Sequence, residues 1–172
     1  MSTTPPLAPL YLVTGPPGVG KSTLLPHLLE LTRGRLVVAD MDELLEDGAL
    51  LGIPIAEPEA APIWPAYDRM WRRIVNLIRR SGYPVLLLRP VPSPDDLVAG
   101  ATWDEPVQWI LLDCADELRQ ARLQARGWAQ DWIDDAARDA ESARRIVRTV
   151  VRTDDEDSQG IAERVLARVD LG

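Results

Sequence analysis

Five short apolar runs alternate along the chain with longer stretches in which apolar and polar residues are mixed. The runs lie at residues 10–14, 35–39, 84–88, 107–112 and 147–151. Runs of this length, bounded by polar residues or turn residues, are typical of buried strands. Strands that alternate with helical patterns favour a parallel sheet that is covered by helices on both faces. The pattern therefore predicts an α/β fold of three layers around a five-stranded parallel sheet.

The stretches between the runs carry the helical periodicity. We expect helices over residues 21–31, 67–80, 115–126, 131–146 and 161–169, with further short helices beginning near residues 42 and 95. In the second of these helices, an apolar stripe is expected to face the core, with most of the arginines outside it. That stripe consists of Met70, Ile74, Leu77 and Ile78. Residues 51–65 are rich in proline and alanine and predict a loop.

Composition narrows the class of protein. The chain has 172 residues, of which 46% are hydrophobic and 27% charged, as expected for a single globular domain. The net charge of −8 argues against binding to nucleic acid or to an acidic membrane surface. No apolar run reaches the length that spans a bilayer. A lone cysteine, Cys114, excludes an internal disulfide, so we expect a cytoplasmic protein, either a monomer or a homodimer.

The turn after the first apolar run carries the clearest chemistry. Residues 15–22 read GPPGVGKS, which fits the phosphate-binding pattern G-x-x-x-x-G-K-[ST]. Its glycines allow backbone amides to approach phosphate oxygens, and the following helix adds the positive end of its dipole. Lys21, the only lysine in the chain, is expected to reach the β- and γ-phosphates. The hydroxyl of Ser22 is expected to ligate Mg²⁺.

Two acidic sites compete for the metal and for the base of a phosphoryl transfer. Asp40 and Asp42 follow the second apolar run, and Asp113 follows the fourth. Ligands gather where parallel strands end, so both sites qualify by position. If the second strand continued through the pair, both side chains would point the same way, one toward the metal and one toward the acceptor hydroxyl. Asp42 could instead cap a helix, and Asp113 could cap the helix that begins near residue 115.

Arginines supply the remaining candidates for binding. Arg119, Arg122 and Arg126 share one face of a predicted helix because they are three and four residues apart. Arginines that converge on a phosphate stabilise the charge of a transition state. Arg89 ends the third apolar run, where an acceptor would lie, and could bind a carboxylate or a phosphate.

On these residues, the chain resembles the small P-loop kinases, a group that includes shikimate kinase, gluconate kinase and the chloramphenicol phosphotransferase-like proteins with an AAA domain. The resemblance is carried by GPPGVGKST at 15–23, VVADMD at 37–42, LLDCADELRQARLQAR at 111–126 and TDDEDSQGIAERVLARV at 153–169. It implies one P-loop domain over residues 1–172 with the strand order 2-3-1-4-5. It also implies an acceptor-covering segment at about 43–80 and a lid at about 119–135.

The resemblance also implies roles for particular residues. The acid pair matches Asp40 and Asp42, near the metal and the acceptor. Arg122 occupies the place of an arginine that stacks on adenine, and Arg126 matches a lid arginine. Arg69, in the covering segment, is a candidate for the acceptor site, together with Tyr67, Asp68 and Trp71 of the same segment. The nucleotide site is expected to comprise Gly15, Pro17, Gly18, Val19, Gly20, Lys21, Ser22, Thr23 and Arg122.

The expected function is transfer of the γ-phosphoryl group of ATP, with Mg²⁺, to a hydroxyl of a metabolite, nucleoside or antibiotic. The alternative is a nucleotide-binding regulatory or accessory ATPase that has no small acceptor. A GTPase is disfavoured, because the motif that reads guanine requires a second lysine. The turn after the third strand reads RPVP at 89–92, where shikimate kinases carry a glycine-rich turn. The sequence therefore does not identify the acceptor.

Overall fold

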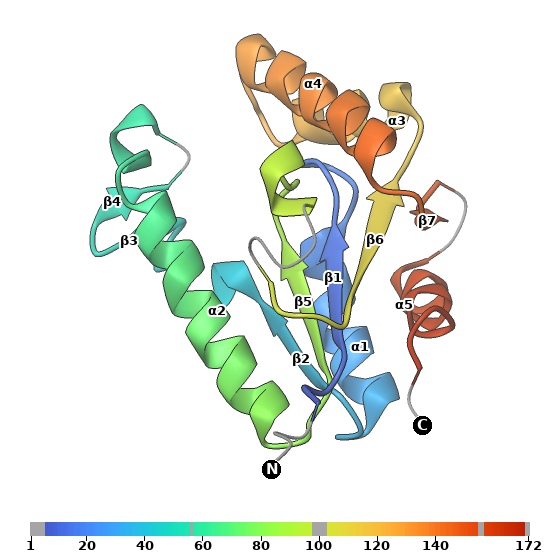
Figure 1. The fold of residues 1–172 in the computed structure, drawn as a ribbon. Coiled ribbons are helices and arrows are strands. Elements are labelled where there is room, and N and C mark those ends of the chain that lie inside the picture. Colours follow the sequence, from blue (N-terminus) through green and yellow to red (C-terminus); the bar gives the residue numbers. More distant parts are fainter. Residues whose placement is uncertain (1–5, 56, 98–102, 155–156, 171–172) are drawn as a thin grey trace.

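The computed structural model describes residues 6–55, 57–97, 103–154 and 157–170. A parallel sheet of five strands runs through its centre in the order β2-β5-β1-β6-β7 (Figure 1). The strands of this sheet are β1 (Leu10–Thr14), β2 (Val37–Asp40), β5 (Val85–Arg89), β6 (Val107–Asp113) and β7 (Val150–Arg152). The predicted α/β fold with a five-stranded parallel sheet is confirmed.

A small hairpin stands outside the main sheet. It consists of β3 (Ala49–Leu50) and β4 (Ile53–Pro54), which pair with each other in antiparallel orientation. Because the hairpin takes the third and fourth labels, strands β5, β6 and β7 hold the places that the sequence analysis gave to its third, fourth and fifth strands.

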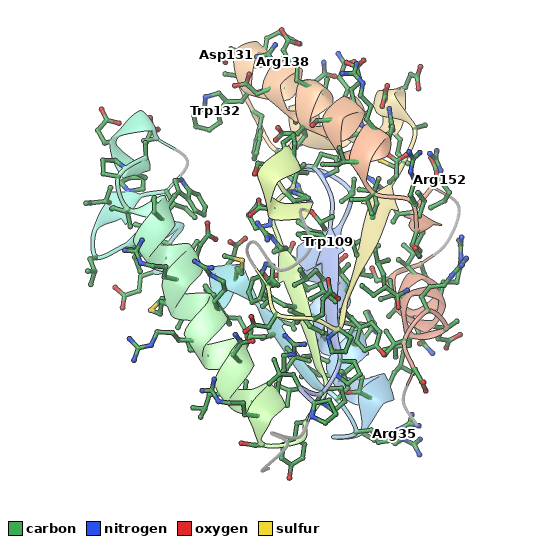
Figure 2. The ribbon with its side chains drawn as sticks, in the orientation of Figure 1. Arg35, Trp109, Asp131, Trp132, Arg138 and Arg152 are labelled. Atoms are coloured by element: carbon green, nitrogen blue, oxygen red, sulfur yellow. The ribbon has the colours of Figure 1, made fainter. Side chains whose placement is uncertain are left out.

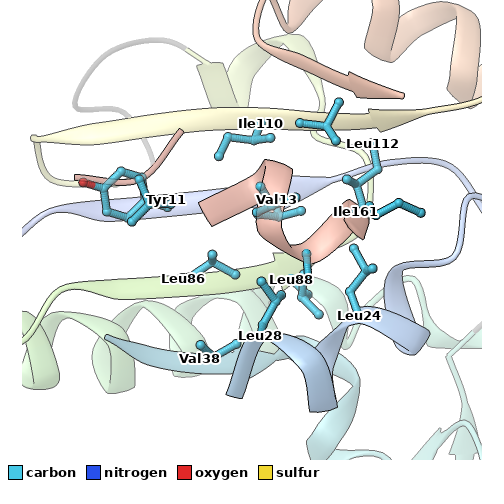
Figure 3. Packing of buried hydrophobic residues seen from close by; sticks show 14 of the residues in the cluster. Tyr11, Val13, Leu24, Leu28, Val38, Leu86, Leu88, Ile110, Leu112 and Ile161 are labelled. Carbon is cyan, nitrogen blue, oxygen red and sulfur yellow. The ribbon is translucent and has the colours of Figure 1, made fainter. Parts of the chain in front are cut away.

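Helices cover both faces of the sheet. α1 (Lys21–Thr32) and α5 (Ser158–Leu166) pack on one face, where Tyr11 and Val13 of β1 join their core (Figure 3). The alternate residues, Leu10 and Leu12, face the opposite side, toward α2 (Trp64–Arg80). Both faces of β1 are buried, which explains why its sequence is a continuous apolar run rather than an alternating one.

Two further helices and three short 3-10 helices complete the chain. α3 (Asp116–Ala125) follows β6, and α4 (Gln130–Ile146) leads back to β7. The C-terminal part of α4 packs on β6 through Ala143. The 3-10 helices are η1 (Met41–Leu44), η2 (Pro58–Ala60) and η3 (Pro94–Leu97). In the described residues, no helix is both long enough and apolar enough to cross a membrane.

The predicted apolar stripe of α2 is wrong for three of its four residues, while Ile78 packs against the core as expected. The buried residues of α2 are Tyr67, Trp71, Val75 and Arg79, which are spaced four residues apart, whereas Met70, Ile74 and Leu77 are 37%, 37% and 60% exposed. The helix is rotated so that its two large aromatic side chains enter the core. The greater apolar area of these rings outweighs that of the aliphatic side chains.

A buried arginine makes this rotation possible. The Arg79 guanidinium is 1% exposed and donates hydrogen bonds to the carbonyl oxygens of Ala8 (2.7 Å), Asp104 (2.7 Å) and Pro106 (3.0 Å). A charged group can remain buried when its donors are satisfied in this way. The arginine thereby ties the end of α2 to the segments that precede β1 and β6.

The helix expected from residue 42 is also wrong. Residues 41–44 form only the 3-10 helix η1, and the hairpin follows. Four residues between 47 and 52 have positive φ, which is incompatible with a helix; they are Asp47, Gly48, Leu51 and Gly52. The short helix expected from residue 95 is η3, and residues 98–101 of that prediction lie outside the described residues.

Candidate active site

The phosphate-binding loop joins β1 to α1 and requires glycine at two positions. At Gly15, a Cβ would lie 2.6 Å from the carbonyl oxygen of Leu112. At Gly18, φ is +88° and a Cβ would lie 2.9 Å from Cγ of Arg119. These glycines therefore let the loop pack tightly against β6 and α3.

The start of α1 offers free donors toward the loop. Its N-cap is Gly20, whose φ is 95°, and the first turn carries neither a side-chain cap nor an acidic residue. The amide of Thr23 donates to the carbonyl oxygen of Gly20 (3.2 Å), and the other amides of this turn face an anion without competition from a side chain. The hydroxyl of Ser22 is exposed beside them, whereas the Thr23 hydroxyl donates to the carbonyl oxygen of Gly20 (2.7 Å).

Lys21 is held against its own loop. Its ammonium group donates hydrogen bonds to the carbonyl oxygens of Gly15 and Pro16, the second at 3.3 Å. Burial lowers the pKa of Lys21 to about 8, and the carboxylates of Asp42, Asp40 and Asp139 oppose that shift. The lysine therefore lies among acidic groups while it faces the place of a phosphate.

Strand β2 does not continue through the acid pair. The condition under which both side chains would point the same way is therefore not met. β2 ends at Asp40, whose Oδ1 accepts from the backbone N–H of Asp42 (3.0 Å), while the carboxylate of Glu43 accepts from the N–H of Asp40 (2.8 Å). This capping box turns the chain into η1, so the cap is Asp40 and not Asp42. Burial raises the pKa of Asp40, and desolvation in the cleft raises that of Asp42, which the Lys21 ammonium opposes.

The ends of three strands bring these groups together. In the sheet, Thr14 pairs with Arg89, and Asp40 pairs with Leu88. The loop that starts after Thr14 therefore lies beside the acid pair and beside Arg89, at the carboxyl edge of the sheet. A cleft of about 520 Å³ opens there.

Most of the predicted site residues line this cleft. They are Gly15, Pro17, Gly18, Gly20, Lys21, Ser22, Asp40, Asp42, Arg89 and Arg126. The candidates Tyr67, Asp68 and Trp71 of the covering segment do not line it, and neither do four residues of the expected nucleotide and acceptor sites. Val19 is buried in the core, Thr23 bonds to its own helix turn, and Arg122 and Arg69 lie elsewhere.

The three arginines predicted to share one helix face have separate roles, and the third, Arg126, follows the end of α3. Arg122 donates to the carbonyl oxygens of Gly18 (3.2 Å) and Thr153 (3.3 Å). It therefore ties the phosphate-binding loop to the residue that follows β7. Arg119 is 3% exposed and donates to Asp116 (2.8 Å). Of the three, only Arg126 lines the cleft.

The two arginines proposed for the acceptor are also separated. Arg69 lies on the outer face of α2, in a hollow that is distinct from the cleft. Arg89 is 6% exposed at the floor of the cleft, with its guanidinium 5.1 Å above the ring of Trp109 and 3.5 Å from Asp96. Burial lowers the pKa of Arg89, and the carboxylates of Asp96 and Asp68 oppose that shift.

Asp113 belongs to a network of ion pairs rather than to the cleft. Its carboxylate accepts from Arg144 at 2.9 Å through both oxygens and from Arg152 at 2.9 Å. It also accepts from the N–H of Cys114 (2.9 Å). The side chain does not cap α3, whose N-cap has no side-chain bond, so the predicted cap is wrong.

Sequence reasoning did not place several side chains that the structure brings to the cleft. They are Ile55, Trp128, Trp132, Asp135 and Asp139, and Trp64 at the start of α2 lines the cleft as well. Asp135 and Asp139 are four residues apart on α4, so helical spacing could have grouped them. The rings of Trp128 and Trp132 meet edge to face at 5.7 Å.

The cleft can hold a metal only with help from a ligand. Among the residues that the structure describes, no group of three or more histidine, cysteine, aspartate or glutamate side chains is arranged around a metal site. The Ser22 hydroxyl and the Asp40 carboxylate both line the cleft and are oxygen donors of the kind that Mg²⁺ prefers. Phosphate oxygens would supply further ligands, as is common for Mg²⁺.

Comparison with known proteins defines the class to which this site belongs. Residues 12–148 match a family model described as an AAA domain. This match covers most of the chain and includes the phosphate-binding loop. The chain therefore belongs to the AAA-domain family. No curated protein matches the chain in sequence.

Solved structures share the fold at low sequence identity. The chain resembles shikimate kinase from Acinetobacter baumannii in complex with shikimate (TM-score 0.63, 18% identity, 94% of this chain and 92% of that one). It also resembles the tunicamycin resistance protein of Deinococcus radiodurans (TM-score 0.64, 20% identity, 96% of this chain and 97% of that one). A gluconokinase from Sinorhizobium meliloti 1021 is similar as well (TM-score 0.58, 17% identity, 94% of this chain and 91% of that one). At these identities the likeness establishes the fold.

Proposed function

We propose that the protein is an ATP-dependent kinase that phosphorylates a hydroxyl group of a small molecule. One observation carries the proposal: the phosphate-binding loop and the acid pair open into the same cleft, which extends past them to Arg89 and the tryptophans. A site for nucleotide alone needs no such extension. The extension gives a second molecule room beside the terminal phosphate, which is the arrangement that direct transfer requires.

The nucleotide would bind through its phosphates. The loop amides and the start of α1 would hold the β- and γ-phosphates, and Lys21 would leave its carbonyl partners to contact them. Ser22 and Asp40 would hold Mg²⁺, which neutralises charge on the phosphate oxygens when it is bound. Arg126, at the lid side of the cleft, would contact the transferring group.

The acceptor hydroxyl would lie next to Asp42. Its oxygen would form a bond to the γ-phosphorus while the bond from that phosphorus to the β–γ bridging oxygen breaks, so that ADP leaves. The hydroxyl proton would pass to the Asp42 carboxylate, which lines the cleft and whose pKa is raised. Asp40 is less available as the base, because one of its oxygens accepts the capping hydrogen bond.

The test is Mg²⁺-dependent release of ADP from ATP, measured with and without a panel of hydroxylated metabolites, nucleosides and antibiotics. We expect one chemical class to stimulate the release and to gain one phosphoryl group by mass spectrometry. Lys21→Met is expected to abolish both signals. If ATP binds but no compound raises a slow basal release or gains phosphate, the proposal fails and the accessory ATPase becomes the better description.

A further inference from the structure

The outer part of the cleft is walled by aromatic and aliphatic side chains from two separate segments. Trp64, at the start of α2, and Ile55, after the hairpin, form one wall. Trp128 and Trp132, which flank the start of α4, form the other. Trp132 is 42% exposed and projects from the first turn of α4 toward the side of the hairpin (Figure 2). An indole so exposed inside a cleft marks a surface that a ligand covers.

The polar groups of the cleft are gathered away from its outer part. A ligand rich in hydroxyl groups needs hydrogen-bond partners, such as carboxylates, guanidinium groups or amides, along its whole length. Among the described residues that line the cleft, none is asparagine, glutamine or histidine. The polar side chains are instead concentrated beside the phosphate-binding loop and on α4, and the space between the two tryptophan walls has apolar sides.

The charges of the cleft are unsuited to an acid. Arg89 is the cation at the floor, but Asp96 lies 3.5 Å from it and Asp68 also opposes its loss of charge. On the lid, α4 presents Asp135 and Asp139 to the cleft. Once Lys21 and Arg126 face nucleotide phosphates, Arg89 is the remaining cation of the cleft. Asp96 and Asp68 already balance its charge, so its buried Nε–H, which has no partner among the described residues, is left to donate to a neutral oxygen of the acceptor.

We infer that the acceptor is an alcohol carried on an aromatic or polycyclic body that has no acidic group. The ring system would lie between Trp64 and the pair formed by Trp128 and Trp132, with its hydroxyl directed to Asp42 at the base of the cleft. Offset or edge-on packing against the indoles would set its orientation. This inference rests on the proposed kinase function in so far as the bound molecule receives a phosphoryl group. Which class of molecule the cleft binds is a separate statement, which can be tested by itself.

Binding and transfer are measured separately on the full chain. The probes are three sets of compounds: ring alcohols, the same rings with an added carboxylate, and open-chain polyols and sugars. Binding is followed by tryptophan fluorescence and calorimetry with a non-hydrolysable ATP analogue present, and transfer by mass spectrometry. We expect only ring alcohols to bind well, with the added carboxylate weakening the affinity about tenfold or more.

Two variants test whether the tryptophan side chains of the cleft bind the ring alcohols. Trp132→Ala is expected to weaken the affinity for ring alcohols by about tenfold and to leave the affinity for the ATP analogue unchanged. Leu77→Ala removes an exposed apolar side chain on the outer face of α2, away from the cleft, and is expected to change neither affinity. Polyols or ring carboxylates that bind as tightly as ring alcohols, or ring alcohols that fail to bind, would overturn the inference. Ring alcohols that bind through Trp132 but never gain phosphate would support the assigned ligand class and refute the kinase function.

Discussion

The ammonium group of Lys21 donates a hydrogen bond to the carbonyl oxygen of Gly15, the first residue of its own phosphate-binding loop. The loop thus satisfies its lysine internally, and a nucleotide has to take the ammonium group from that carbonyl. Burial lowers the pKa of this lysine to about 8, so part of its charge is lost just above neutral pH. Nucleotide binding should therefore depend on pH.

We expect the affinity for ATP to fall about tenfold between pH 7 and pH 9. Phosphates favour the charged lysine, so the complex holds a proton that the empty protein loses above pH 8. The linkage then makes binding weaker as the pH rises. Calorimetry across this range measures the effect, and Lys21→Met should give weak binding with a flat profile. An affinity for wild type that does not change between pH 7 and pH 9 would contradict the prediction.

Asp40→Asn should separate chemistry from stability. Asparagine caps a helix about as well as aspartate, so the turn at η1 should persist and the free energy of unfolding should change by less than about 1 kcal/mol. The loss of the charge should lower kcat by about a hundredfold or more. Asp40→Ala removes the cap as well and should cost about 1 kcal/mol further. Urea unfolding and steady-state kinetics measure the two effects, and equal activity of Asp40→Asn and wild type would exclude Asp40 from the mechanism.

Asp113→Asn should lower the stability of the protein and leave its activity unchanged, which is the opposite of the result expected for Asp40→Asn. The substitution leaves Arg144 and Arg152 without the buried carboxylate that both of them contact. Both arginines are partly exposed and keep Asp116 and Asp154 as partners, so we expect the free energy of unfolding to fall by only about 1–2 kcal/mol, while the activity of the folded fraction is retained. Glu141→Gln, which breaks an exposed ion pair with Arg145, should cost less than about 0.5 kcal/mol. A loss of Mg²⁺ affinity in Asp113→Asn would show that this acid serves the metal.

Two glycines with nearly equal φ provide a matched pair of substitutions. Gly18 has φ +88° and its added Cβ would contact Arg119, whereas Gly82 has φ +89° and nothing within 4 Å. Alanine at either position should cost about 1–2 kcal/mol of stability through the backbone. Only Gly18→Ala should also weaken ATP binding, by about tenfold or more, because its loop must shift. Calorimetric titration of both variants tests this, and equal affinities would show that the loop tolerates the side chain.

Arg79→Ala should destabilise the protein strongly without touching the cleft. Its guanidinium satisfies three backbone carbonyls that would be left buried, so we expect a loss of about 3 kcal/mol or more in the free energy of unfolding. Arg80→Ala, at the exposed neighbouring position, should change it by less than about 0.5 kcal/mol. Urea unfolding followed by circular dichroism compares the two, and similar midpoints would contradict the assigned role.

The sequence was informative where one local pattern dominates. The apolar runs predicted all five strands of the sheet, because strands buried on both faces cannot carry polar residues. The phosphate-binding loop was predictable because its conformation requires glycine at fixed positions. The helix over residues 67–80 was predicted, but its buried face was not, since the partners that satisfy Arg79 come from segments far away in the chain.

The composition of the cleft could not be predicted for a similar reason. Trp64 and Trp132 are 68 positions apart in the numbering, and only the placement of α2 and α4 at the same edge of the sheet brings both to one cavity. The sequence analysis expected too many of the arginines at 119, 122 and 126 to face a ligand. Spacing shows that residues share a helix face, but it does not show what that face contacts. Two of these arginines bind backbone or side-chain groups of the protein itself.

The ion pairs of Arg144 fix the last turn of α4, whereas Trp132 belongs to its first turn. Their separation of twelve positions corresponds to about 18 Å along the helix axis. Rotation of the helix by only about 5° around its fixed end displaces the indole by about 1.6 Å, by the same geometry. A change in the tilt of α4 would therefore move the indole of Trp132 further than it moves Arg144. The packing of Ile133 and Ala136 against Leu123 restrains that tilt.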